Sequence, residues 1–106
     1  MPTDHGHVVS TFHQATPELV DKAIQGALQA KVEWEALPFE DRASVFLKAA
    51  DLLSTKYRAE VLAAVMLGTG KNVWQAEVDA AVETIDFWRF NAKYGQSALA
   101  CFLIGP

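Results

Sequence analysis

The clearest helical pattern in the chain lies in residues 72–94, which read NVWQAEVDAAVETIDFWRFNAKY. Apolar side chains recur there at steps of four and three, the spacing that places side chains on one face of an α-helix. Polar and charged side chains occupy the rest of the circumference. The pattern predicts an amphipathic helix with one buried face, formed by Trp74, Val78, Ala81, Ile85 and Trp88.

Three more helices are expected before this one. The first begins at Pro17, because Thr16 can cap a helix and proline suits its first position, and it runs to about Trp34. Its apolar stripe comprises Val20, Ala23, Ile24, Ala27 and Leu28. Pro38 opens the second helix, with a continuous buried face expected from Phe39, Ala43, Phe46, Ala50, Leu53 and Tyr57. The third helix, residues 58–67, ends at Gly68-Thr69-Gly70, where glycine can adopt the left-handed conformation.

The two ends of the chain differ from this helical middle. Residues 7–12, HVVSTF, are rich in β-branched and aromatic side chains and predict one short strand. Residues 95–106, GQSALACFLIGP, are uncharged and mostly apolar, and no further helix or strand is expected after them. We therefore divide the chain into a helical part, residues 5–94, and a divergent apolar tail, residues 95–106.

The predicted fold class is mostly α, with four helices and one short N-terminal strand. A lone strand leaves its hydrogen-bonding groups unpaired, so the pattern favours a piece of a larger α/β protein. A self-sufficient four-helix bundle with an N-terminal arm is the alternative that periodicity leaves open.

Composition narrows the function. The 106 residues suffice for one domain, and 9 Lys and Arg against 13 Asp and Glu give a net charge of -4, so neither nucleic acid nor an anionic membrane is expected as a partner. The longest apolar runs have seven residues, against about 20 for a membrane-spanning helix. A single cysteine excludes an intrachain disulfide, and residues 1–7 lack the pattern of a signal or transit peptide.

Short motifs for phosphate or metal binding are incomplete. Gly68-Thr69-Gly70-Lys71 lacks the earlier glycine and the following Ser or Thr of a phosphate loop, and Val73 stands where a dinucleotide fingerprint needs its third glycine. His5, His7 and His13 lie close in sequence but have no evident fourth ligand. No metal site is therefore expected.

No catalytic nucleophile is predicted either, although one helix carries a set of acids. Cys101 sits among apolar residues with no nearby base to activate it, so it is interpreted as an apolar side chain without a catalytic role.

Asp79, Glu83 and Asp86 share one face of the helix over residues 72–94, with Phe87 and Phe90 beside them. This face is either a solvated surface or one wall of a pocket.

Two segments resemble the aldehyde dehydrogenase superfamily. The run RASVFLKAADLL, residues 42–53, preceded by Trp34 and Pro38, is similar to its early helices. The run GTGKNVWQAEVDAAVETIDFWRFNAKY, residues 68–94, is more specific and resembles the members that oxidise glutamate γ-semialdehyde in proline breakdown. The resemblance covers roughly residues 5–94, and residues 95–106 depart from it.

The resemblance implies an NAD-dependent oxidoreductase with a Rossmann-like NAD domain, a cysteine nucleophile, a homo-oligomeric assembly and, in animals, a place in the mitochondrial matrix. No residue here matches the family's catalytic or cofactor-binding positions, so the chain alone is predicted to be an inactive fragment that binds no NAD. Its partners would be the remainder of the enzyme or its subunits. The alternative is a noncatalytic helical module that docks on another protein.

One site residue can be carried over from the resemblance. The helix over residues 72–94 borders the aldehyde entry tunnel in such enzymes, and Glu83 falls at its inward acidic position. The implied role of Glu83 is recognition of the amino-acid end of the substrate, not acid–base chemistry.

Overall fold

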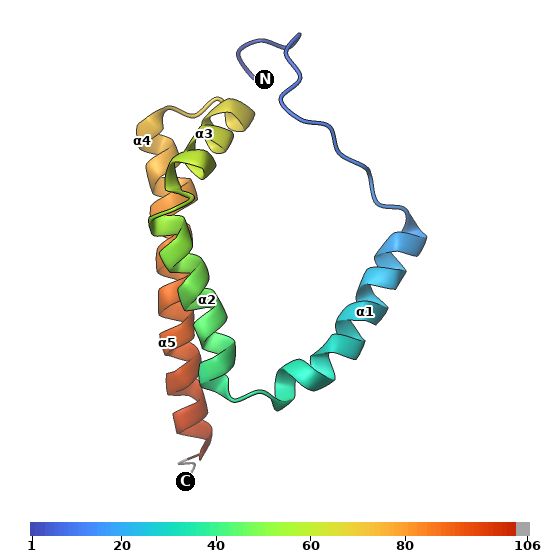
Figure 1. The fold of residues 1–106 in the computed structure, drawn as a ribbon, viewed down its shortest axis with the longest axis vertical. Helices are drawn as coiled ribbons and strands as arrows, with labels where there is room; N and C mark the ends of the chain where they lie inside the picture. The colour runs from blue at the N-terminus through green and yellow to red at the C-terminus, as the bar shows by residue number, and fades with distance from the viewer. Residues whose placement is uncertain (104–106) are drawn as a thin grey trace.

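Four helical rods make up most of the computed structural model, which describes residues 1–103 (Figure 1). Three of them are α1 (Pro17–Ala36), α2 (Phe39–Ser54) and α3 (Arg58–Thr69). The fourth rod runs without a break through α4 (Val73–Ala76), the π-helix η1 (Glu77–Val82) and α5 (Glu83–Leu103). The predicted mostly-α class with four helices is confirmed.

The ends of the helices follow the capping residues. Thr16 caps α1, where its Oγ1 accepts a hydrogen bond from the Leu19 N–H at 3.3 Å. Gly70 ends α3 in the left-handed conformation, with φ 73°, so the predicted glycine stop is confirmed two residues past Gly68. Asn72 begins α4 with a reciprocal capping box to Gln75, in which both hydrogen bonds are about 3 Å long.

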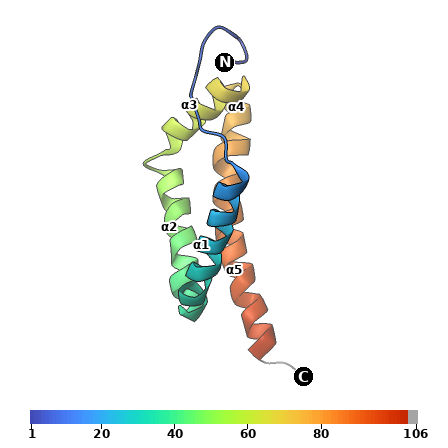
Figure 2. The ribbon, with the colours of Figure 1, turned by 90° about the vertical axis from the view of Figure 1, so that its right-hand side faces the viewer.

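The core is small and lies between α2, α3 and the fourth rod, which runs beside α2 in both views (Figures 1 and 2). Helices α5 and α2 approach closely where Gly95 of α5 meets Phe39 of α2. The glycine permits this approach, because a Cβ at residue 95 would lie 2.9 Å from the Phe39 Cζ. The six buried core residues are Ala50, Leu53, Leu62, Ala76, Ala81 and Ile85.

The π-helix changes which side chains of the fourth rod are buried. The sequence predicted a stripe that includes Trp74 and Val78, but Trp74 is 77% exposed and Val78 is also exposed. Ala76 is buried in their place, and the next buried residue, Ala81, follows five positions later. A π-turn carries one extra residue, so it shifts the buried face by one position. Downstream of it the predicted residues Ile85 and Trp88 lie on the core side.

Two further predictions about the N-terminal half are wrong. Residues 7–15 are irregular and form no strand, since residues 1–103 contain no second strand to share a ladder. The face predicted along the second helix is buried only at Ala50 and Leu53, while Phe46 and Tyr57 are exposed. The helix itself ends at Ser54, and Tyr57 lies in the turn that follows.

Helix α1 stands away from the packed rods (Figure 1), and none of its residues is buried. Its predicted apolar stripe is therefore exposed. The radius of gyration is 18.4 Å, against about 13 Å for a compact domain of this length. This open arrangement is not a self-contained four-helix bundle.

The predicted boundary between residues 94 and 95 lies inside a helix. Helix α5 continues across it to Leu103, so the first part of the predicted tail is helical. Residues 104–106, the end of that tail, lie outside the described residues. The division of the chain at this boundary stays a prediction.

Candidate functional site

Glu83 is the first residue of α5 and directly follows the π-helix. Its backbone N–H donates to the Val78 carbonyl, five residues earlier, and this bond closes the π-turn. The side chain is exposed, and the ion pairs within residues 1–103 do not include it. Glu83 therefore presents a carboxylate at the point where the rod returns to α-helical geometry.

Two ion pairs hold the π-helix to α3 and to the turn after it. Glu77, the first residue of η1, accepts hydrogen bonds from Arg58, the first residue of α3, with Nε to Oε1 at 3.3 Å and Nη2 on Oε2. Asp79 pairs with Lys71. The sequence analysis missed both pairs, because partners 19 and 8 positions apart leave no local pattern.

The predicted acidic face is therefore divided. Asp79 pairs with Lys71, whereas Glu83 and Asp86 are exposed. Phe87 and Phe90, predicted to lie beside the acids, are also exposed. Glu83 does not line the four main hollows of the described residues.

The glycine turn does not fit a dinucleotide. Gly68 and Thr69 lie at the end of α3, not after a strand, and Gly70 serves as its cap. A Cβ at Gly70 would lie 3.2 Å from the Pro2 side chain, so the N-terminal arm already occupies this side of the turn. This glycine turn therefore does not form the phosphate cradle of a dinucleotide site.

The other reactive side chains are scattered. His5, His7 and His13 lie exposed on the irregular arm, and Cys101 lies exposed near the end of α5. In the part of the chain that the structure describes, no three His, Cys, Asp or Glu side chains are grouped to hold a metal ion. No helix among residues 1–103 is long and apolar enough to cross a membrane.

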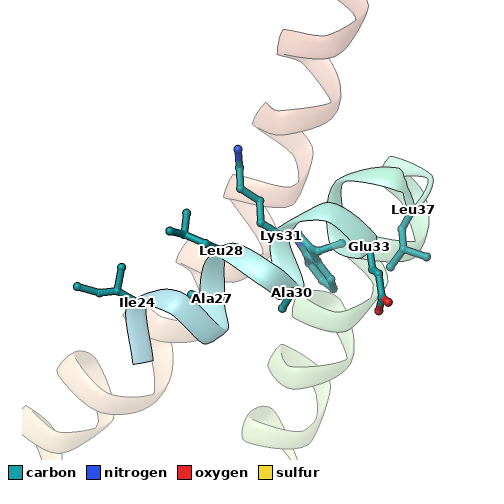
Figure 3. Close-up of a pocket in the computed structure, with 8 residues that line it drawn as sticks. Ile24, Ala27, Leu28, Ala30, Lys31, Glu33 and Leu37 are labelled. Atoms are coloured by element: carbon teal, nitrogen blue, oxygen red, sulfur yellow. The ribbon is translucent and has the colours of Figure 1, made fainter. Parts of the chain in front are cut away.

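One hollow of the described residues lies on the exposed face of α1 (Figure 3). It measures about 740 Å³, and its lining is mostly apolar, including Ile24, Leu28 and Leu37. A smaller hollow near the junction of α1 and α2 is lined by Trp34, Phe39, Phe46 and Trp88 together with Arg42. The Arg42 Nε is buried there without a hydrogen-bond partner, a costly state for a charged donor.

Comparison with known proteins gives the ancestry of this arrangement. A family model described as the aldehyde dehydrogenase family matches residues 1–100. The chain belongs to the aldehyde dehydrogenase family. The resemblance found in the sequence is thereby confirmed at the level of the family.

Three curated relatives share one name. The mitochondrial delta-1-pyrroline-5-carboxylate dehydrogenase of Dictyostelium discoideum is 62% identical over 94 residues, which are 89% of this chain and 17% of that protein. The delta-1-pyrroline-5-carboxylate dehydrogenase of Agaricus bisporus is 58% identical over 94% of this chain and 18% of its own. The human mitochondrial enzyme of that name is 58% identical over 88% of this chain and 16% of its own.

A solved aldehyde dehydrogenase structure shares the helical arrangement. The delta-pyrroline-5-carboxylate dehydrogenase of Mycobacterium tuberculosis superposes with a TM-score of 0.79 at 50% identity, over 81% of this chain and 16% of that one. The helices therefore match part of an aldehyde dehydrogenase fold. The chain spans 16–18% of the length of the relatives named here.

Proposed function

We propose that this chain is the N-terminal helical part of an NAD-dependent dehydrogenase that oxidises L-glutamate γ-semialdehyde to glutamate in proline catabolism. The shared name of the relatives supports the proposed oxidation of the semialdehyde. One structural observation supports the proposal that this chain is only a part of the enzyme. Helix α1 has 20 residues and buries none of them, although its sequence has an apolar stripe. A helix of this kind gains its stability by packing that face against other protein.

Glu83 is proposed to bind the amino-acid end of the substrate. An ionised carboxylate attracts the α-ammonium group of the semialdehyde, and a charge-assisted hydrogen bond between them would orient the aldehyde. Glu83 makes no ion pair within residues 1–103, so no cation of that part of the chain competes with the substrate ammonium group for its carboxylate. The proposed role is recognition of the substrate, not acid–base chemistry.

The hydride acceptor is proposed to be NAD, bound by the rest of the enzyme. In support, the glycine-rich turn at Gly70 caps α3 and lies against Pro2, so it is not available as a dinucleotide cradle. The contribution of this chain to the reaction is therefore limited to binding the substrate. The purified chain is expected to form no NADH when given glutamate γ-semialdehyde and NAD.

A chimeric enzyme tests the proposal. Residues 5–94 of this chain would replace the matching stretch of the Dictyostelium relative, which is 62% identical to this chain over 94 residues. Glutamate γ-semialdehyde oxidation within several-fold of the parent enzyme is expected, measured by NADH fluorescence. A folded, oligomeric chimera that does not oxidise this substrate would contradict the proposal.

Glu83 is tested within the same chimera by Glu83→Gln, which keeps the shape and removes the charge. Losing a charge-assisted hydrogen bond of about 1.5–3 kcal/mol should raise KM for the semialdehyde roughly 10-fold or more. The matched control is Asp86→Asn, an exposed acid one turn further along α5. Equal effects of the two substitutions would remove Glu83 from substrate recognition.

The partners and the compartment follow from the same proposal. The exposed face of α1 is proposed to pack on the remainder of the enzyme within a homo-oligomer. Because the Dictyostelium and human relatives are named mitochondrial, the mitochondrial matrix is the proposed location. Fractionation of cells with an antibody to this segment tests that placement, and a signal confined to the cytosol would contradict it.

A noncatalytic module that docks on another protein is the second candidate. The observation in its favour is the apolar hollow along α1, which could receive a partner (Figure 3). An inactive chimera, together with one-to-one binding of the chain to a purified partner, would favour this alternative.

A further inference from the structure

Glu83 heads a row of side chains along α5 whose other members are aromatic. Phe87, Phe90 and Tyr94 follow it at steps of four, three and four residues, the spacing that keeps side chains on one helix face. Their side chains are 62%, 51% and 62% exposed. Ile85, Trp88 and Ala92, which lie on the core side or line the hollows toward α2, occupy the opposite part of the circumference. The row therefore faces away from α2.

The cations of α5 are not directed at this row. Arg89 and Lys93 line the hollow between α5 and α2, on the other side of the helix. The cation–π contacts within residues 1–103 involve the rings of Phe39 and Tyr57. Within residues 1–103, Phe87 is exposed and makes none of the cation–π contacts that the structure shows.

Phe87 also differs from the other two aromatic members. Phe90 and Tyr94 stack on each other, with ring centroids 6.1 Å apart. Phe87 is one turn from Glu83, and side chains in that relation have Cβ atoms about 5–6 Å apart. An ammonium group held by the Glu83 carboxylate would therefore lie within the roughly 6 Å over which an aromatic ring attracts a cation.

We propose that Phe87 is a second specificity-determining residue, whose ring binds the ammonium group of the amino-acid aldehyde that Glu83 binds. This inference rests on the proposed function. Carboxylate and ring together select for an aldehyde that carries an α-ammonium group and against the same aldehyde without one. Phe90, paired with Tyr94, contributes nothing to this selection.

The test uses the chimeric enzyme and two substrates that differ only in the amino group, glutamate γ-semialdehyde and glutarate semialdehyde. Phe87→Leu keeps an apolar side chain of similar size and removes the ring. Its KM for glutamate γ-semialdehyde should rise about 3- to 10-fold, within the range of a cation–π contact, with kcat within twofold. Its KM for glutarate semialdehyde should stay within twofold.

Two matched variants complete the test. Phe87→Trp retains a ring and should restore a KM equal to or below that of the chimera, whereas Phe90→Leu should leave both substrates unaffected. Equal KM changes for the two substrates in Phe87→Leu, or an effect of Phe90→Leu as large as that of Phe87→Leu, would overturn the inference.

The outcomes for Glu83 and for Phe87 can be read separately. If Glu83→Gln changes KM and Phe87→Leu does not, only the inference about Phe87 fails. If Glu83→Gln changes nothing, the proposed role of Glu83 fails, and with it the inference about Phe87. If a folded chimera is inactive, the proposed dehydrogenase function itself fails.

Discussion

Arg58 and Glu77 join the first residue of α3 to the first residue of the π-helix through a two-point contact. Both side chains are 34% exposed, so water screens the pair only in part. A guanidinium that meets a carboxylate with two nitrogens fixes orientation as well as distance. The pair therefore sets the angle at which α3 meets the fourth rod.

Arg58→Ala and Glu77→Ala should each destabilise the packed rods, and the double variant should show coupling of about 0.5–1 kcal/mol, typical of a half-exposed pair. Urea unfolding of the chain, followed by circular dichroism, measures this. Arg58→Lys should recover only part of the coupling, because lysine cannot make the two-point contact. Strict additivity of the two alanine substitutions would show that the pair contributes nothing.

Asn72 supplies the cap that begins the fourth rod. Asn72→Ala removes the acceptor for the Gln75 N–H, which lies 2.9 Å from the Asn72 Oδ1, and should cost about 1 kcal/mol. Asn72→Asp keeps the acceptor and should cost much less. Hydrogen exchange at the amides of α4 reports the loss locally, and unchanged protection in Asn72→Ala would argue against the cap.

Deleting Val78 should convert η1 into ordinary α-helix. Ala76 and Ala81 are both buried although they are five positions apart, and removal of one residue between them gives a spacing of four, which is normal for an α-helix. Melting temperature should therefore be retained, with the N–H of Glu83 then bonded four residues back. Val78→Ala is the control for the lost side chain. If the deletion variant unfolds while Val78→Ala stays folded, the extra residue is required for packing.

The N-terminus of α1 makes a pH-dependent contact. A hydrogen bond from the Thr16 side chain, aided by the backbone N–H of Glu18, lowers the pKa of the Glu18 carboxyl. A lowered folded-state pKa stabilises the helix above the unfolded pKa, and this contribution is lost as pH falls through the folded value. In Thr16→Ala the Glu18 pKa should rise toward its ordinary value, as followed by carboxyl-carbon NMR. An unchanged titration would contradict the contact.

Local signals in the sequence predicted where α1 and α2 begin and where α3 ends. Thr16-Pro17, Pro38 and Gly70 act through their own backbone and nearest neighbours, so their effect does not depend on distant residues. The strand over residues 7–12 was wrong because a strand needs a partner strand, which lies beyond local sequence.

The site was predictable only in part. Ile85 and Trp88 were placed correctly because they lie in the regular α-helix α5. Trp74 and Val78 were misplaced, since a helical period of 3.6 cannot anticipate an inserted residue. The long-range pairs of Glu77 and Asp79 left no pattern to read. The roles of Glu83 and Phe87 stay predictions.

The bare surface of α1 has a consequence for any cell that makes this polypeptide by itself. Quality-control chaperones and proteases recognise unfolded chains by hydrophobic side chains that are buried in a native protein. Leu19, Val20, Ile24 and Leu28 would offer them such a signal along one helix. The lifetime of the polypeptide would then depend on how quickly another protein surface packs against those four side chains.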